Sequence, residues 1–285
     1  MGGCTVAVED RAEATRNGWQ SGARLYGMKY SHPVLASRMA LELTGVQFEP
    51  HDLFPGLHGA IVRAKGFSAW TVPALEIHGR KVQGSLAIAR ELDGLVPSAG
   101  LFPADRERRR AVERAERFGH DELQPIARRV FRWAGTRDHA MRAWIARYLV
   151  GAPAPSLAGY VFKPVMMFFT RVVSKADAEQ VREDLRRLSA LLDRADALIE
   201  DGTIGDRGPN AADLQVLTSI RLLMAHEDLH PAIAPRPCGT AALRLIPDYP
   251  RSGPDALPPV PAALPREWLP KAAAQHLQPI QGGRQ

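Results

Sequence analysis

The chain of 285 residues is long enough for two modest domains, and its 45% hydrophobic and 24% charged residues are ordinary for a globular protein. This composition excludes wholesale disorder, a collagen helix and a coiled coil. The net charge of +6 is carried mostly by arginine, and nine arginines lie between Arg106 and Arg132. Acidic residues interleave with them, so the pattern indicates a solvated helix face and we expect no nucleic-acid partner.

Two features lead us to expect a cytoplasmic protein. Cys4 and Cys238 lie far apart and form no CxxC pair, which excludes a disulfide scaffold and a dithiol motif and fits a reducing compartment. The nearest approach to a membrane span, residues 157–173, is interrupted by Lys163 and Pro164. We therefore expect neither a transmembrane helix nor a membrane partner.

Residues 1–22 are polar and aperiodic, which predicts a flexible extension. Residues 23–97 mix short apolar runs with turns, and their order is β-α-β, a variable stretch, then β-β-α. The expected elements are a strand at 23–27, a helix at 33–43 ended by Gly45, a strand beginning at 46–48, a strand and turn at 72–79 paired with 81–82, and a helix at 85–92.

Residues 104–234 have an almost wholly helical pattern. The run from Ser174 to Asp177 is a capping-box pattern ahead of a long helix, and a second capping signal from Asn210 to Asp213 opens a buried apolar helix. Residues 235–285 hold 11 of the 23 prolines, which forbids long helices and central strands. This proline-rich tail is expected to be disordered or to wrap the body in an extended form.

Three local motifs follow one another in an order that is typical of one enzyme family. They are the strand–turn–helix entry at 25–33, the pair 71–75 and 84–88, and the capping box at 210–213. In this order they resemble the cytosolic glutathione transferase family over residues 24–234, with neither tail matched. The resemblance implies an α/β thioredoxin-like N-terminal domain followed by an all-α C-terminal domain, and a homodimer.

Proline at the start of an apolar strand is unusual, because it cannot donate to a strand ladder. A cis bond between Val72 and Pro73 would resolve the conflict by turning the N–H and C=O of Val72 outward. The resemblance implies that this main chain holds the cysteinyl backbone of glutathione like an added strand. An ordinary trans proline at a sheet edge is the alternative.

Ser85 opens a helix, where its hydroxyl and the first-turn N–H groups form a ready carboxylate site. The resemblance implies that it binds the γ-glutamyl carboxylate, although a plain N-cap would also explain it. Many family members have an acidic residue just before this serine, to pair the γ-glutamyl ammonium, but this chain has Gly84. Either another residue supplies the carboxylate that pairs with the γ-glutamyl ammonium, or the bound thiol is not glutathione.

The expected chemistry needs a thiolate, and a hydroxyl donor beside a helix N-terminus can stabilise one. The sequence Ser31-His32-Pro33 resembles the entry of the theta-like serine classes, which makes Ser31 the favoured donor. Tyr30 is the rival, because other classes use tyrosine, whereas Tyr26 falls within the strand and is expected to point into the core. Ser31 acting only as a helix cap is the alternative.

A histidine after the second strand contacts the glycyl carboxylate in the theta-like pattern, and His58 resembles it. A surface-loop histidine is an equally good interpretation, and Arg63 or Lys65 could serve the same carboxylate.

The second substrate of such enzymes lies against side chains of the helical domain. Aromatic and methionine side chains suit a loose apolar pocket, although the same residues at helical spacing could simply be core. The candidates are Phe131, Tyr160 and Met166, with Trp133, Phe162, Met167, Phe168 and Phe169 nearby in sequence.

The run from His226 to His230 matches HExxH, in which two histidines one helical turn apart bind zinc. Pro231 follows directly, so the helix should end within the motif, and no third ligand stands out. We expect no metal site here and keep a zinc hydrolase only as a remote alternative.

The sequence therefore predicts a transferase that activates glutathione, or a related low-molecular-weight thiol, as a thiolate for attack on a small apolar electrophile. It would need no cofactor, since glutathione is a co-substrate. The main alternative is a non-catalytic relative that uses the same two domains for binding or as a scaffold.

Overall fold

A computed structural model describes residues 22–161, 163–168, 176–205, 208–249 and 259–270. The chain divides into two compact units, Met1–Phe102 and Pro103–Gln285. Cys4 and the predicted cap Ser174 lie outside the described residues. Among the helices that are described, none is both long enough and apolar enough to cross a membrane.

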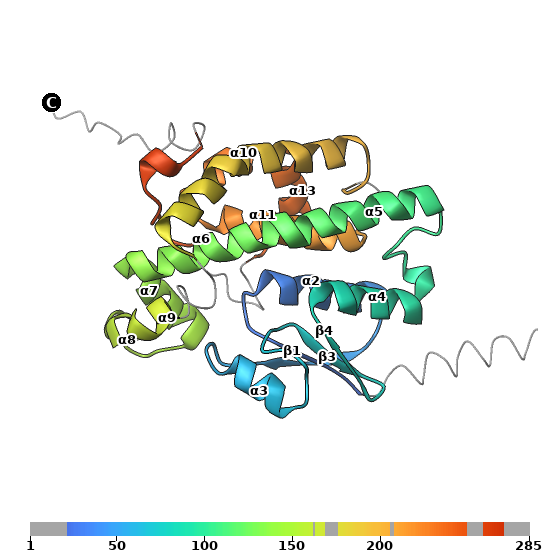
Figure 1. The fold of residues 1–285 in the computed structure, drawn as a ribbon, viewed down its shortest axis with the longest axis horizontal. Coiled ribbons are helices and arrows are strands. Elements are labelled where there is room, and N and C mark those ends of the chain that lie inside the picture. The colour runs from blue at the N-terminus through green and yellow to red at the C-terminus, as the bar shows by residue number, and fades with distance from the viewer. Residues whose placement is uncertain (1–21, 162, 169–175, 206–207, 250–258, 271–285) are drawn as a thin grey trace, which may run out of the picture. The chain divides into compact units, whose positions relative to one another are not determined.

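The first unit is built on a four-stranded sheet with strand order β2-β1-β3-β4 (Figure 1). The strand β1 runs parallel to β2, and the pairs β1–β3 and β3–β4 are antiparallel. The elements are β1 (Ala23–Gly27), α2 (His32–Thr44), β2 (Phe48–Asp52), α3 (His58–Ala64), β3 (Ala74–Ile77), β4 (Arg80–Gln83), α4 (Ser85–Leu95) and a short turn η1 (Pro97–Ala99).

Helices cover both faces of this sheet, with α2 and α4 on one side and α3 on the other (Figure 1). On the α3 side, Tyr26 and Ala74 of the sheet pack against Val62 of α3 and against Phe67. Successive side chains of a strand point to opposite faces, so Leu25 belongs to the other face. This order of elements confirms the predicted thioredoxin-like domain.

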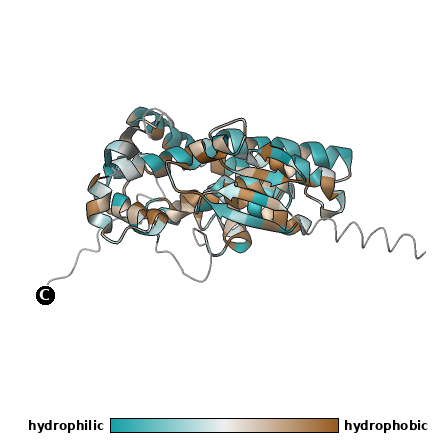
Figure 2. Cartoon of the chain, turned by 90° about the horizontal axis from the view of Figure 1, so that it is seen from below, coloured by the Kyte–Doolittle hydropathy of each residue, from teal (hydrophilic) through white to brown (hydrophobic). Residues whose placement is uncertain are grey.

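The second unit is helical and is organised around α11 (Ala211–Ala225), in which every residue is buried. In Figure 2 hydrophilic and hydrophobic residues alternate along the ribbons of the helices, as expected of amphipathic helices packed on a core. The remaining elements are α5 (Arg106–Phe118), η2 (Gly119–Leu123), α6 (Gln124–Arg137), α7 (His139–Ile145), η3 (Ala146–Val150), α8 (Pro155–Val161), α9 (Lys163–Phe168), α10 (Ala178–Glu200), α12 (His230–Ile233), α13 (Pro237–Leu245) and η5 (Arg266–Trp268).

Gly119 allows the chain between α5 and α6 to approach α11 closely. A Cβ at this position would lie 2.9 Å from the backbone nitrogen of Val216, which is closer than real Cβ atoms come. The glycine therefore sets how closely η2, between α5 and α6, approaches α11.

The predicted cap of α11 is confirmed as a complete capping box. The Asn210 side chain accepts hydrogen bonds from the N–H groups of Ala212 and Asp213, and the Asp213 carboxylate accepts one from Asn210 N–H at 2.9 Å. Asp213 also accepts from Gly205 N–H at 2.7 Å. Burial raises the pKa of Asp213 to about 6, against the opposing effect of these hydrogen bonds.

The predicted start of the long helix α10 is wrong by one turn. The helix begins at Ala178, and Asp177 is its N-cap, with the side chain accepting from Gln180 N–H at 2.7 Å. Aspartate is itself a strong N-cap residue, so the residue expected inside the first turn takes the cap position instead.

Part of the proline-rich tail is extended and packs on the helical unit. Val260 forms a parallel bridge with His226, since its N–H donates to the Ala225 carbonyl at 2.8 Å and its carbonyl accepts from Glu227 N–H at 3.1 Å. The Asp228 carboxylate then accepts from the N–H groups of residues 263 and 264 at 2.6 and 2.9 Å. These bonds hold residues 260–264 against the loop that follows α11.

Candidate functional site

Ser31 lies between β1 and α2, at the N-cap position of the helix. Its backbone N–H donates to the Met28 carbonyl at 3.2 Å, and its carbonyl accepts from Leu35 N–H at 2.8 Å. Its side chain makes no capping hydrogen bond to the described first turn, although serine is a favoured cap. The main chain of Ser31 is therefore fixed, while its hydroxyl is not used as a helix cap.

The two tyrosines near Ser31 differ in their surroundings. Tyr26 is 2% exposed, and its hydroxyl donates to the Glu76 carboxylate at 3.5 Å, which places it in the core as predicted. Tyr30 is half-buried and has a φ of 66°, in the left-handed region that aromatic residues rarely adopt. Tyr30 thus immediately precedes Ser31 in a backbone conformation that is unfavourable for its residue type.

The peptide bond between Val72 and Pro73 is cis, as the sequence analysis expects. The Pro73 carbonyl accepts from Gly84 N–H at 2.9 Å. Within the described residues, no hydrogen bond uses the N–H or C=O of Val72. The main chain of Val72 therefore has both its polar groups available for a bound peptide.

The loop before Val72 is held by Gln83, a residue that the sequence analysis missed. The Gln83 amide donates to the carbonyls of Ala69 and Thr71 at 2.9 and 2.6 Å and accepts from Ala69 N–H at 2.8 Å. No sequence pattern marks this role, because it depends on the pairing of β3 with β4. Gln83 thereby fixes the approach to the Val72 main chain.

Gly84 and Ser85 form the junction between β4 and α4. Gly84 has φ 93° and ψ 142°, a region that is essentially restricted to glycine. A Cβ there would meet no atom within 4 Å of described structure, so backbone strain rather than a clash disfavours a side chain. Ser85, 3% exposed, is the first residue of α4. The junction at Gly84 thus has a backbone conformation that disfavours a side chain.

His58 is the first residue of α3, and its N–H donates to the Phe54 carbonyl at 3.1 Å. The Arg63 guanidinium donates to the carbonyls of Phe67 and Ser68 at 2.8 and 2.7 Å, and the Lys65 ammonium lies 4.9 Å from the centre of the Tyr26 ring. Both cations therefore have structural roles, and His58 stays a prediction as the partner of a carboxylate.

The register of the sheet brings the other predicted thiol-site residues to the same end of the strands. Tyr26, near the end of β1, pairs with Ala74, which begins β3, and Ala74 pairs with Gln83, which ends β4. Ser31 follows β1, the segment Val72–Pro73 precedes β3, and Gly84–Ser85 follow β4. The hydroxyl of Ser31, the main chain of Val72 and the start of α4 are consequently grouped at the same end of the sheet.

The chain is similar to known proteins that have this arrangement of strands and helices. The family model described as "Glutathione S-transferase, N-terminal domain" matches residues 25–100. The first unit of the chain therefore matches the N-terminal domain of glutathione S-transferases. The comparison with curated proteins found no match.

Solved structures extend the likeness to the helical unit. The chain is similar to a glutathione S-transferase from Rhodospirillum rubrum F11, at 16% identity over 87% of this chain and 98% of that chain, with a TM-score of 0.56. It is also similar to glutathione transferase F2 from Populus trichocarpa, at 14% identity over 80% and 94% of the two chains, with a TM-score of 0.55. A third similar structure is glutathione S-transferase-I bound with lactoylglutathione, at 16% identity over 81% and 96%, with a TM-score of 0.54.

At these identities the solved structures show the fold alone, which is the glutathione S-transferase fold: a thioredoxin-like domain followed by a largely helical one. None of the comparisons assigns a class within the family, so the theta-like serine class stays a prediction.

The predicted second-substrate residues have contrasting environments in the helical unit. Phe131 is half-buried and makes edge contacts with the rings of Trp144 and His226, at centroid distances of 6.3 and 5.9 Å. Tyr160 is 66% exposed and lies 5.3 Å from the His139 ring. The side chains of Met166 and Phe168, and residues 162 and 169, lie outside the described part. Phe131 therefore lies in an aromatic cluster, whereas Tyr160 lies on the surface of its unit.

The HExxH run does not lie on one helix. The helix α11 ends at Ala225, and His226 has an extended backbone with φ −75° and ψ 126°. His226 is fully buried, and this burial lowers its pKa to about 4. His230 begins the next helix, and its Nδ1 lies 3.0 Å from the Met224 carbonyl. The residues described here include no group of three side chains able to hold a metal ion.

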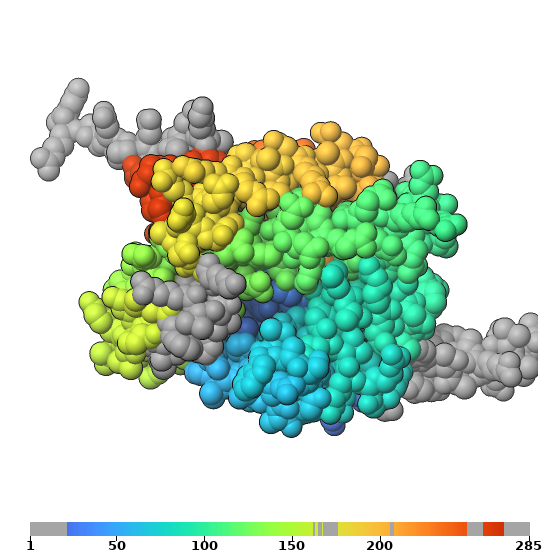
Figure 3. Space-filling view, in the orientation of Figure 1, coloured from blue at the N-terminus to red at the C-terminus, as the bar shows by residue number. Residues whose placement is uncertain are grey.

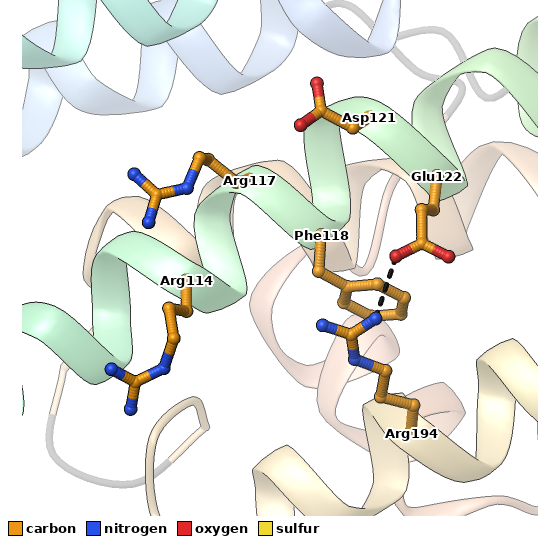
Figure 4. A pocket seen from close by; sticks show the side chains of 6 residues that line it. All are labelled: Arg114, Arg117, Phe118, Asp121, Glu122 and Arg194. Carbon is orange, nitrogen blue, oxygen red and sulfur yellow. Dashed lines mark hydrogen bonds and ion pairs between the residues drawn. The ribbon is translucent and has the colours of Figure 1, made fainter.

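A shallow hollow of about 260 Å³ lies between α5, η2 and α10 in the helical unit (Figure 4). The Arg194 guanidinium donates to the Glu122 carboxylate at 2.8 Å and lies 4.2 Å from the centre of the Phe118 ring. Arg114, Arg117 and Asp121 complete its lining. None of the predicted site residues lines it.

Proposed function

We propose that the protein is a thiol transferase that binds glutathione, or a related low-molecular-weight thiol, on its first domain and adds it to a small apolar electrophile. The observation that carries the proposal is the grouping of the Ser31 hydroxyl, which caps no helix, with the unused main-chain groups of Val72. Ser85 at the start of α4 is the proposed carboxylate binder, and His58 is the proposed partner of the second carboxylate. No cofactor is required.

The energetic demand on Ser31 can be compared with what its position offers. Lowering a thiol pKa from about 8.5 to about 6.5 requires about 2.7 kcal/mol of preferential stabilisation of the anion. A hydrogen bond to a charged group contributes about 1.5–3 kcal/mol, and a helix N-terminus adds about 0.3–1 kcal/mol. One hydroxyl at the start of α2 is therefore sufficient to keep a bound thiol ionised near neutral pH.

In the proposed reaction the thiol proton passes to solvent, and the Ser31 hydroxyl donates to the resulting thiolate. The sulfur then forms a bond to the electrophilic carbon. With an aryl halide as the electrophile, the halide leaves with the electron pair of the bond that breaks. Tyr30 is the rival donor, and mutation of each residue in turn shows which of the two hydroxyls donates to the thiolate.

The test combines binding with turnover. The protein should be retained on immobilised glutathione and released by free glutathione. Turnover of a reactive aryl halide should fall in Ser31→Ala and persist in Tyr30→Phe. The opposite result would transfer the role to Tyr30, and retention of full activity in both variants would contradict the proposed activation.

One observation favours a second candidate, a binding protein without catalysis. Gly84 supplies no carboxylate for the γ-glutamyl ammonium, and its backbone conformation disfavours any replacement. Calorimetric binding of glutathione without turnover of any electrophile in a panel would support this candidate. Cytoplasmic location and a homodimer remain expectations, which fractionation and sedimentation velocity respectively test.

A further inference from the structure

The short helix α8 buries a glycine and exposes its larger apolar side chains. Gly159 is its buried residue: a Cβ there would lie 3.1 Å from the Arg142 Cβ and 3.2 Å from the Arg142 backbone carbon, on α7. Leu157 and Val161 each lie two residues from Gly159, which is about 200° around a helix, so they point away from α7. They are 67% and 66% exposed. A helix that buries a glycine and exposes leucine and valine has an outward apolar face.

Tyr160 extends this face and is equally exposed, so the apolar surface of α8 consists of Leu157, Tyr160 and Val161. Figure 3 shows α8 and α9, in yellow-green, on the surface of the helical unit. A tyrosine ring with an apolar body and a polar tip is typical of side chains at a boundary between oil and water.

The charged residues that flank α8 in sequence are basic. Between Asp138 and Asp177 the sequence has 38 residues with no acidic side chain and five basic ones, of which Arg142 is buried and Arg171 and Lys175 lie outside the described residues. Lys163, at the start of α9, and Arg147, in η3, are both exposed. The apolar surface of α8 is thus accompanied by cations with no acidic residue between these two aspartates in sequence.

We propose that the outward face of α8 binds an anionic lipid bilayer surface, with Leu157 and Val161 entering the interface and Lys163 and Arg147 contacting the headgroups. Apolar side chains beside cations are the features of interfacial helices, and anionic lipid attracts each nearby cation. The segment lies on the bilayer and does not span it. This proposal differs from the expectation of no membrane partner, which rested on the absence of a spanning segment.

Charge argues for lipid over a second copy of the chain. In a two-fold symmetric contact the same patch faces itself, so Lys163 and Arg147 would meet identical cations. Three exposed side chains on a seven-residue helix also provide little apolar area compared with a stable dimer, which buries about 1,200–2,000 Å².

The experiment is vesicle co-sedimentation of the full chain. One set of vesicles is phosphatidylcholine, and the other is equal parts phosphatidylcholine and phosphatidylglycerol. The protein should sediment with the second set, and added salt should release it. The double substitution Leu157→Ser and Val161→Ser should weaken binding at least tenfold, and Lys163→Glu should weaken it severalfold. Arg106→Glu, an exposed charge reversal on α5, should leave binding unchanged.

Circular dichroism of each variant checks that the helices remain, which is expected because the substituted side chains are exposed. No binding to the anionic vesicles, or equal binding by the wild type and the double variant, would overturn the proposal. Self-association of the wild type in sedimentation velocity that the double variant abolishes would also overturn it, since a second copy would then cover the face.

Discussion

Burial of His226 should make the stability of the helical unit depend on pH. The ring is fully buried, and within the described residues neither of its nitrogens has a hydrogen-bond partner. Its pKa is lowered by this burial to about 4, whereas an unfolded histidine titrates near about 6.5. As the pH falls, the unfolded chain takes up the proton first. The contribution of His226 is therefore complete above about pH 6.5 and is lost as the pH falls toward 4.

The two pKa values set the size of the effect. Lowering the pH from 7.5 to 5 should reduce the free energy of unfolding by about 2 kcal/mol through this one residue. His226→Leu removes the titration and also the two unpaired nitrogens, so the variant should be at least as stable as the wild type at pH 7.5 and more stable by about 2 kcal/mol or more at pH 5.

Urea denaturation at the two pH values, followed by the fluorescence of the buried Trp133 and Trp144, measures this difference. His139→Leu, at an exposed position of the same unit, is the matched control and should keep the wild-type pH dependence. If the wild type and His226→Leu lose the same stability between the two pH values, the reasoning is refuted.

Four further substitutions test the site and the packing. Ser31→Ala should lower kcat/KM about 10- to 100-fold in an aryl halide assay, by loss of a hydrogen bond to an anion; an unchanged value contradicts its role. Gly84→Ala should lower the free energy of unfolding by about 1–2 kcal/mol in a thermal unfolding experiment, because the φ of this residue is 93°. An unchanged free energy of unfolding would exclude backbone strain at this position. Gly119→Ala should cost about 1–3 kcal/mol from the contact with Val216, whereas the exposed Gly94→Ala, with no atom within 4 Å of its Cβ, should gain about 0.5–1 kcal/mol.

Local patterns predicted those parts of the fold in which neighbouring residues decide the structure. The capping box from Asn210 to Asp213 and the buried helix after it depend on contacts within a few residues, and both are present. The cis bond at Val72 was likewise predicted, because proline conflicts with the strand around it. Tyr26 was correctly placed in the core by its position in the strand.

The parts that escaped prediction depend on distant partners. The start of β2 was predicted, but not its course through Pro50 to Asp52, residues that disfavour strands and that are held in the sheet by pairing with β1. The helix α3 fell in the stretch that the sequence analysis left variable. Gln83 has its role only because the fold brings the loop at 69–71 beside β4. The docking of residues 260–264 on the loop after α11 likewise joins segments with no common pattern.

That docking determines when each domain can be completed during synthesis. All the residues of the first unit precede Pro103, so it can fold as soon as they have left the ribosome. The helical unit is completed later, because among the described residues the Ala225 carbonyl, the Glu227 N–H and the Asp228 carboxylate form hydrogen bonds with residues 260–264. A nascent chain cut before Val260 would carry a complete first domain joined to a helical domain that lacks these hydrogen bonds.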